Sequence, residues 1–275
     1  MKKILAILLM LLLLGGCSGK NLMTVDGFAV SSDLYHYYYQ SAAAEYEGDS
    51  AAAEARELLR AHVAVIRFAE KYSVSLSEAE KKEVEQQIQS AKNRNDDFTE
   101  MLEKQALTEP LYRELCLHDA LRQKLMAHLH TQVYAVTEEQ MRQIIETEFV
   151  CARHIFFENT AQGADLAAQA VAEKLSNGAD FDALFAEYMG EDYSEEPYLF
   201  GKGYMVEEFD AAARALAVGQ VSGVVQTAYG WHIIHRLPLD WDTIETKMDA
   251  ITEEYIQTQI SMAMAQAASQ YEIIE

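Results

Sequence analysis

The hydrophobic pattern of this 275-residue chain changes near residue 149. After Val25-Asp26-Gly27, which predicts a turn, apolar side chains recur every three or four residues up to about Glu148, which indicates a series of amphipathic helices. From Phe149 to Phe157 the chain is instead apolar on both faces, which is typical of a strand within a sheet. The sequence therefore predicts an α+β protein whose N-terminal part is mostly helical.

Helix-capping patterns support the helical assignment of residues 24–146. Ser77 with Glu80, and Thr137 with Gln140, each match a capping box, in which two side chains satisfy backbone donors at the start of a helix. The same segment carries aromatic and aliphatic stripes at helical spacing, which are more typical of a core than of a ligand site.

The expected α+β unit spans residues 147–238. After the first strand, the pattern predicts three helices and then two closing strands, over Val221–Thr227 and Trp231–Leu237. Beyond it, residues 239–275 contain apolar positions from Ile244 to Met262 that predict one long amphipathic helix. This helix has no matching stripe inside the α+β unit, so we expect it to pack back on the N-terminal helices.

The first seventeen residues have the pattern of a secretion signal. Two lysines precede an apolar run from Ile4 to Leu14, which is too short to span a bilayer, and Gly15-Gly16-Cys17 follows directly. This segment resembles a bacterial lipoprotein signal. The resemblance implies removal of residues 1–16, lipid on Cys17, a short tether over 17–23, and anchoring at the outer face of the cell membrane or in an outer membrane. The alternative is an ordinary signal peptide with an incidental cysteine.

The charge balance excludes one class of partner. The chain has 44 acidic and 22 basic residues, a formal net charge of −22, which argues against nucleic-acid binding because phosphates would be repelled. No Cys/His spacing matches a zinc site, and no metal is expected. Cys116 and Cys151 lie in apolar runs, where buried free thiols are expected, although an oxidising compartment would also permit a disulfide between them.

Sequence motifs within residues 147–238 resemble those of parvulin-type peptidyl-prolyl isomerases. Each motif alone is weak, but five in the family's order and spacing are specific. They are Ala152-Arg153-His154-Ile155, Gly178-Ala179-Asp180-Phe181, Phe200 to Phe209, Gly219-Gln220-Val221-Ser222 and Tyr229 to Ile234. With the lipoprotein signal and the flanking helices, the whole chain resembles PrsA-type extracytoplasmic foldases and is similar to SurA-like chaperones.

The resemblance implies a parvulin domain, a small antiparallel sheet with surrounding helices, inserted between a helical chaperone-like module and the C-terminal helix. It implies catalysis of cis/trans isomerisation at X-Pro bonds of exported polypeptides as they fold. The phosphate-specific branch of the family has basic residues just after the first strand, whereas this chain has Glu158 there. Phosphoserine recognition is therefore not expected.

Catalysis of this reaction requires few chemical groups in the site. Rotation about an X-Pro amide meets a barrier of about 18–20 kcal/mol, but no bond is made or broken. A catalyst needs an apolar socket for the proline ring and polar groups that favour the twisted amide, without metal, cofactor or strong nucleophile. Met205 and Phe209 lie four residues apart, so they point the same way and can form that socket. By the resemblance, Phe200 also contributes to substrate binding.

The resemblance also implies a polar group beneath the socket. His154 and His232 correspond to paired histidines that hydrogen-bond each other and Thr227, with a structural and electrostatic role. An acidic residue beside the substrate carbonyl is expected shortly after Tyr188. One alignment selects Glu191 and another, which we prefer, selects Asp192.

Two rival interpretations remain open from the sequence. The family's Gly-Asp-Leu-Gly is replaced here by Glu196-Pro197-Tyr198-Leu199, which changes the rim of the pocket. The first rival is therefore a non-catalytic chaperone lipoprotein whose degenerate parvulin domain only binds peptides. The second, a structural surface lipoprotein, would leave the ordered motifs unexplained.

Overall fold

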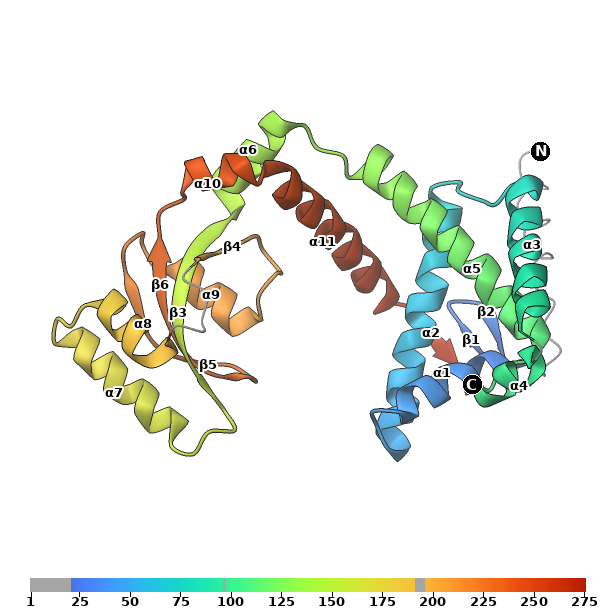
Figure 1. The fold of residues 1–275 in the computed structure, drawn as a ribbon, viewed down its shortest axis with the longest axis horizontal. Helices are drawn as coiled ribbons and strands as arrows, with labels where there is room; N and C mark the ends of the chain where they lie inside the picture. Colours follow the sequence, from blue (N-terminus) through green and yellow to red (C-terminus); the bar gives the residue numbers. More distant parts are fainter. Residues whose placement is uncertain (1–20, 96, 191–195) are drawn as a thin grey trace. The chain divides into compact units, whose positions relative to one another are not determined.

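A computed structural model describes residues 21–95, 97–190 and 196–275 (Figure 1). The chain divides into two compact units. The first, here called the helical unit, takes the chain up to Ala135 and again from Gln259 to Glu275; the second, the sheet unit, is Val136–Thr258. Within the described ranges, no helix combines the length and the apolar character needed to cross a membrane.

The helical unit is built mainly from five α-helices in its described part. They are α1 (Ser32–Ala43), α2 (Gly48–Lys71), α3 (Glu78–Arg94), α4 (Phe98–Lys104) and α5 (Glu109–His128), the last continued by a π-helical turn over Leu129–Val133. The predicted capping box of Ser77 and Glu80 is confirmed at the start of α3. Leu59 and Val63 of α2 are fully buried beside Leu34 and Leu111, so α2 lies at the centre of this core.

A three-stranded sheet joins the two chain segments of the helical unit. Its strands are β1 (Asn21–Val25), β2 (Phe28–Ser31) and β7 (Ile273–Ile274), in the order β2-β1-β7. The predicted turn is confirmed between β1 and β2, where Asp26 and Gly27 both have positive φ, at 48° and 74°. β1 begins at Asn21, so it includes the last residues of the segment expected as a tether. The short β7, which pairs antiparallel with β1, was not expected.

The sheet unit is centred on four antiparallel strands in the order β4-β3-β6-β5. These are β3 (Val150–Glu158), β4 (Tyr198–Phe200), β5 (Val221–Gln226) and β6 (Gly230–Leu237). Three helices flank this sheet: α7 (Ala164–Ser176), α8 (Phe181–Met189) and α9 (Glu207–Ala215). α7 and α8 pack around Ile155 and Ile233 on one face, whereas α9 packs around Ala152 and Ile234 on the other (Figure 1).

Two further helices of the sheet unit correct the expected boundaries. α6 (Glu138–Glu148) starts with the predicted capping box, but it belongs to this unit rather than to the N-terminal helices. The expected single C-terminal helix is instead α10 (Trp241–Thr246) followed by α11 (Met248–Ala268), because Lys247 leaves helical geometry. Ile244 and Met248 pack against Met141 and Ile145, so the start of this segment does have an apolar partner near the sheet.

Cys116 and Cys151 are free thiols in the described part of the chain. Cys151 is buried and Cys116 is half-buried, and burial raises the pKa of both thiols. Of the two sequence interpretations, the structure therefore supports unpaired cysteines. Cys17, Glu191 and Asp192 lie outside the described residues.

Candidate active site

The register of the central strands brings the two predicted histidines together. β3 pairs with β6 so that Phe156 faces His232 and His154 faces Ile234. Directly opposed residues share a face of the sheet, so both imidazoles lie on the face that α9 covers. The Nδ1 atoms of His154 and His232 are 2.8 Å apart, a hydrogen bond in which one ring donates and the other accepts.

Thr227 extends this contact to a third side chain. Its Oγ1 lies 2.9 Å from Nε2 of His232 and also accepts a hydrogen bond from the amide of Tyr229 at 3.1 Å. Thr227 holds this position because its amide donates to the carbonyl of Gly230 and closes the β5–β6 hairpin. A Cβ on Gly230 would lie 2.1 Å from the carbonyl oxygen of Phe157, so only glycine fits there.

Both imidazoles are neutral near pH 7. Burial lowers the pKa of His154 to about 4, with a further contribution from His232, and burial lowers the pKa of His232 to about 4 as well. The pair therefore acts as a set of fixed dipoles rather than as a charged group at neutral pH. Both Nδ1 atoms bond each other and Nε2 of His232 bonds Thr227, so these hydrogen bonds orient the two rings.

A pocket of about 340 Å³ opens above this pair. Met205 lies just before α9 and Phe209 lies in its first turn, and both line the pocket. The Phe209 ring meets both imidazoles edge-on, with centroids 5.2 Å from His154 and 5.3 Å from His232. The two predicted wall residues and the two histidines thus surround one hollow.

Phe200 has a different position from the one expected. Its side chain is only 1% exposed and is not among the residues that line the pocket. Its ring lies 5.8 Å from that of Phe209. Phe200 therefore supports the Phe209 wall from behind and does not form part of the pocket surface.

Several pocket residues were not identified as site residues from the sequence. Phe156 shares the strand face of His154, so alternation along β3 could have identified it. Tyr198 was not predictable in this way because β4 pairs with β3 over only a few residues, with Tyr198 opposite Ala152. Its ring meets His154 edge-on at a centroid distance of 5.4 Å. The remaining lining residues are Tyr204, Val206 and Tyr229.

The arrangement suits binding and conformational catalysis. An apolar, aromatic hollow with a thioether wall can hold a proline ring, and a neutral polar pair lies at its base. In the described part of the chain, no cluster of three or more His, Cys, Asp or Glu side chains could hold a metal ion. Among the residues that the structure describes, those that line the hollow include no lysine, arginine or carboxylate.

Comparisons with known proteins agree with this geometry. Residues 154–237 match the family model described as rotamase, PPIC-type PPIASE domain. The chain is 33% identical over 162 residues to the foldase protein PrsA of Oceanobacillus iheyensis, covering 55% of this chain and 51% of that protein. It is 32% identical over 173 residues to the foldase protein PrsA 3 of Bacillus anthracis, covering 60% and 54%.

The chain spans about half the length of these curated relatives. A solved structure of peptidylprolyl isomerase (PrsA) from Bacillus anthracis aligns at a TM-score of 0.43 and 23% identity, covering 77% of this chain and 95% of that chain. Residues 154–237 therefore form a PPIC-type PPIase domain of the parvulin family, in a chain related in sequence to the PrsA foldases.

Proposed function

We propose that this protein is an extracytoplasmic, membrane-anchored peptidyl-prolyl cis/trans isomerase and foldase that assists exported polypeptides. The observation that carries the proposal is the 2.8 Å contact between His154 and His232 beneath an apolar pocket walled by Met205 and Phe209. Relatives named as PrsA foldases and the PPIC-type domain match support the same activity. Lipid on Cys17 would supply the anchor.

In the proposed mechanism the pocket acts on the conformation of the bound amide. The proline ring is held against Met205 and Phe209, while the preceding residue remains free to turn. A planar amide is more polar than a twisted one because resonance separates charge, so an apolar hollow without water disfavours the planar ground state. The barrier to rotation is thereby lowered without proton transfer or covalent attack.

The histidines complete the site electrostatically. Because both rings are neutral near pH 7, they present oriented dipoles at the base of the pocket rather than an acid or a base. In our proposal, Asp192, or Glu191 in the alternative alignment, lies beside the substrate carbonyl. Glu158 follows the first strand where a phosphate-binding branch would need a cation, so the proposed substrates are unphosphorylated X-Pro segments.

Exchange spectroscopy on an Ala-Pro peptide tests the activity directly. We expect the intact protein to accelerate cis/trans exchange above the uncatalysed rate, which is on the scale of tens of seconds. Met205→Ala should lower the catalysed rate because it removes a wall of the pocket. Leu166→Ala is the matched control, because Leu166 is 65% exposed on α7, against the opposite face of the sheet. If the intact protein does not accelerate the exchange, the proposed isomerase activity is wrong. The alternative, a non-catalytic peptide-binding chaperone, would then be favoured.

A further inference from the structure

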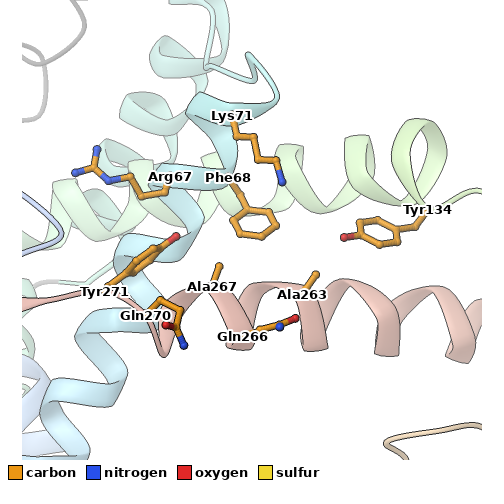
Figure 2. Close-up of a pocket in the computed structure, with 9 residues that line it drawn as sticks. All are labelled: Arg67, Phe68, Lys71, Tyr134, Ala263, Gln266, Ala267, Gln270 and Tyr271. Atoms are coloured by element: carbon orange, nitrogen blue, oxygen red, sulfur yellow. The ribbon is translucent and has the colours of Figure 1, made fainter.

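The helical unit contains a second pocket, of about 450 Å³, that the isomerase site does not use (Figure 2). Phe68 and Lys71 come from the last turn of α2, and Tyr134 follows α5. Ala267 and Tyr271 come from the end of α11 and the segment after it. All these residues belong to the same compact unit, so the pocket is a property of that unit alone.

Hydrogen bonds to main-chain carbonyls hold the segment after α11 against the rest of this unit. Arg60 on α2 donates from Nε to the carbonyl of Tyr271 at 3.1 Å, and the amide of Asp26 donates to the carbonyl of Glu272 at 2.8 Å. The small side chain of Ala267 lies opposite the Phe68 ring, which leaves the space open (Figure 2). The shape of the pocket therefore follows from how these segments are held together within the helical unit.

The charge of the pocket differs from that of the chain as a whole. The chain carries twice as many acidic as basic residues, 44 against 22, yet the pocket lining contains two cations and no carboxylate. Arg67 is already paired with Asp26 and Glu70, each at 2.9 Å. The charge of Arg67 is thus balanced, and Lys71 is the cation that a ligand could meet.

Lys71 has aromatic partners only. Its ammonium lies 5.4 Å from the Phe68 ring centroid and 5.0 Å from that of Tyr72, and no carboxylate among the described residues forms an ion pair with it. Figure 2 shows the ammonium and the Tyr134 hydroxyl both directed at the space beside the Phe68 ring. An apolar surface therefore adjoins a cation and a hydroxyl donor.

We infer that this pocket binds an extended client segment that carries a large apolar side chain next to a carboxylate. The apolar group would contact Phe68 and Ala267, and the carboxylate would meet Lys71 and the hydroxyl of Tyr134. The amide of Gln270 can bond the peptide backbone. The inference rests on the proposed foldase function in one respect, that unfolded polypeptides are the protein's ligands.

Fluorescence anisotropy with the full chain tests this inference. The probes are two labelled, proline-free peptides, one of Leu-Glu pairs and one with lysine in place of each glutamate. We expect the glutamate peptide to bind about tenfold more tightly than the lysine peptide. This ratio corresponds to a difference of about 1.4 kcal/mol in binding free energy. Lys71→Glu and Ala267→Trp should each weaken its binding by about the same factor. Lys104→Glu is the matched control, because Lys104 is an exposed lysine of α4 in the same unit.

Three results would overturn the inference: no binding of the glutamate peptide, equal binding of both peptides, or unchanged binding in both pocket variants. If circular dichroism shows that Ala267→Trp is not folded, Lys71→Gln decides in its place. Self-association that Lys71→Glu abolishes would assign the pocket to a second copy and also overturn the inference. Isomerisation of the Ala-Pro peptide by the intact chain is measured in a separate assay. Absence of catalysis in that assay would contradict the proposed isomerase activity but not peptide binding at this pocket.

Discussion

At the scale of single residues, the site depends on buried hydrogen bonds between side chains. His154, His232 and Thr227 are each less than a tenth exposed, and each hydrogen bond between them gives a partner to two buried polar atoms. Tyr198, from the segment in which the sequence departs from the motif it resembles, places an aromatic ring edge-on to His154.

Thr227→Val should both destabilise the protein and slow the proposed catalysis. Valine has the shape of threonine but leaves Nε2 of His232 without its partner, so we expect a loss of about 1–3 kcal/mol in the free energy of unfolding. The freed ring should also lower the isomerisation rate. Thr147→Val is the control, because the hydroxyl of Thr147 bonds only carbonyls of its own helix and is exposed. Equal stability of the two variants would contradict the proposed hydrogen-bond series.

The buried histidines predict a pH dependence of stability in the sheet unit. In the unfolded chain they take up protons below about pH 6.5, whereas in the folded unit the pKa of both rings is about 4. Between these values the unfolded state binds more protons, so stability decreases as the pH falls from 6.5 to 4, by up to about 1.4 kcal/mol per ring and pH unit.

Tryptophan fluorescence during urea unfolding measures this effect, because Trp231 and Trp241 both lie in the sheet unit. His232→Gln should reduce the slope of stability against pH, while His36→Gln, at an exposed position in the helical unit, should not. A wild-type stability that is flat between pH 6.5 and 4 would show that the rings do not remain neutral in the folded state.

At the scale of elements, a short edge strand pairs with a longer strand in each sheet. β4 brings Tyr198 to the pocket, and β7 adds the C-terminal residues to β1. By contrast, the helix starts at Ser77 and Thr137 follow from local hydrogen bonds and were predicted from sequence. Short strands have too few residues to show an alternating pattern, so long-range pairing decides them.

Removal of Ile273–Glu275 should loosen β1. The truncated chain loses the pairing of β7 with Thr24 and Val25 and the ion pair between Glu275 and Arg56. We expect faster hydrogen exchange of the β1 amides and a lower free energy of unfolding of the helical unit. Ile274→Ala is the control, since it keeps the main-chain pairing and its side chain is already 56% exposed. Unchanged exchange in the truncated chain would show that β7 does not stabilise the sheet.

At the scale of the whole molecule, one unit is continuous in sequence and the other is not. The helical unit is closed by residues 259–275, so the sheet unit is an insertion within it. The inserted unit begins earlier and ends later than the sequence motifs suggested, because α6 and α10 bury their apolar faces together. With these helices, the sheet unit has an additional small hydrophobic core around Phe149.

Cys17→Ser should release the protein from the membrane in a bacterial host. Two or more acyl chains on this residue would hold the chain firmly, since each buried methylene contributes about 0.8 kcal/mol. Fractionation should therefore find the wild type with membranes and the variant in the soluble fraction. Cys116→Ser is the control, because Cys116 lies within α5 and should leave the fractionation unchanged. Membrane association of the Cys17 variant would contradict lipid anchoring.

Features that depend on near neighbours along the chain could be predicted from the amino-acid sequence. Helix starts, the Asp26–Gly27 turn and the alternation that places His154 with Phe156 all follow from residues a few positions apart. The position of Phe200 behind the pocket and the addition of β7 to β1 needed the tertiary structure, and the contact between His154 and His232 was expected only through the family resemblance. These depend on strand register and on burial of apolar surface from remote parts of the chain, which local patterns do not encode.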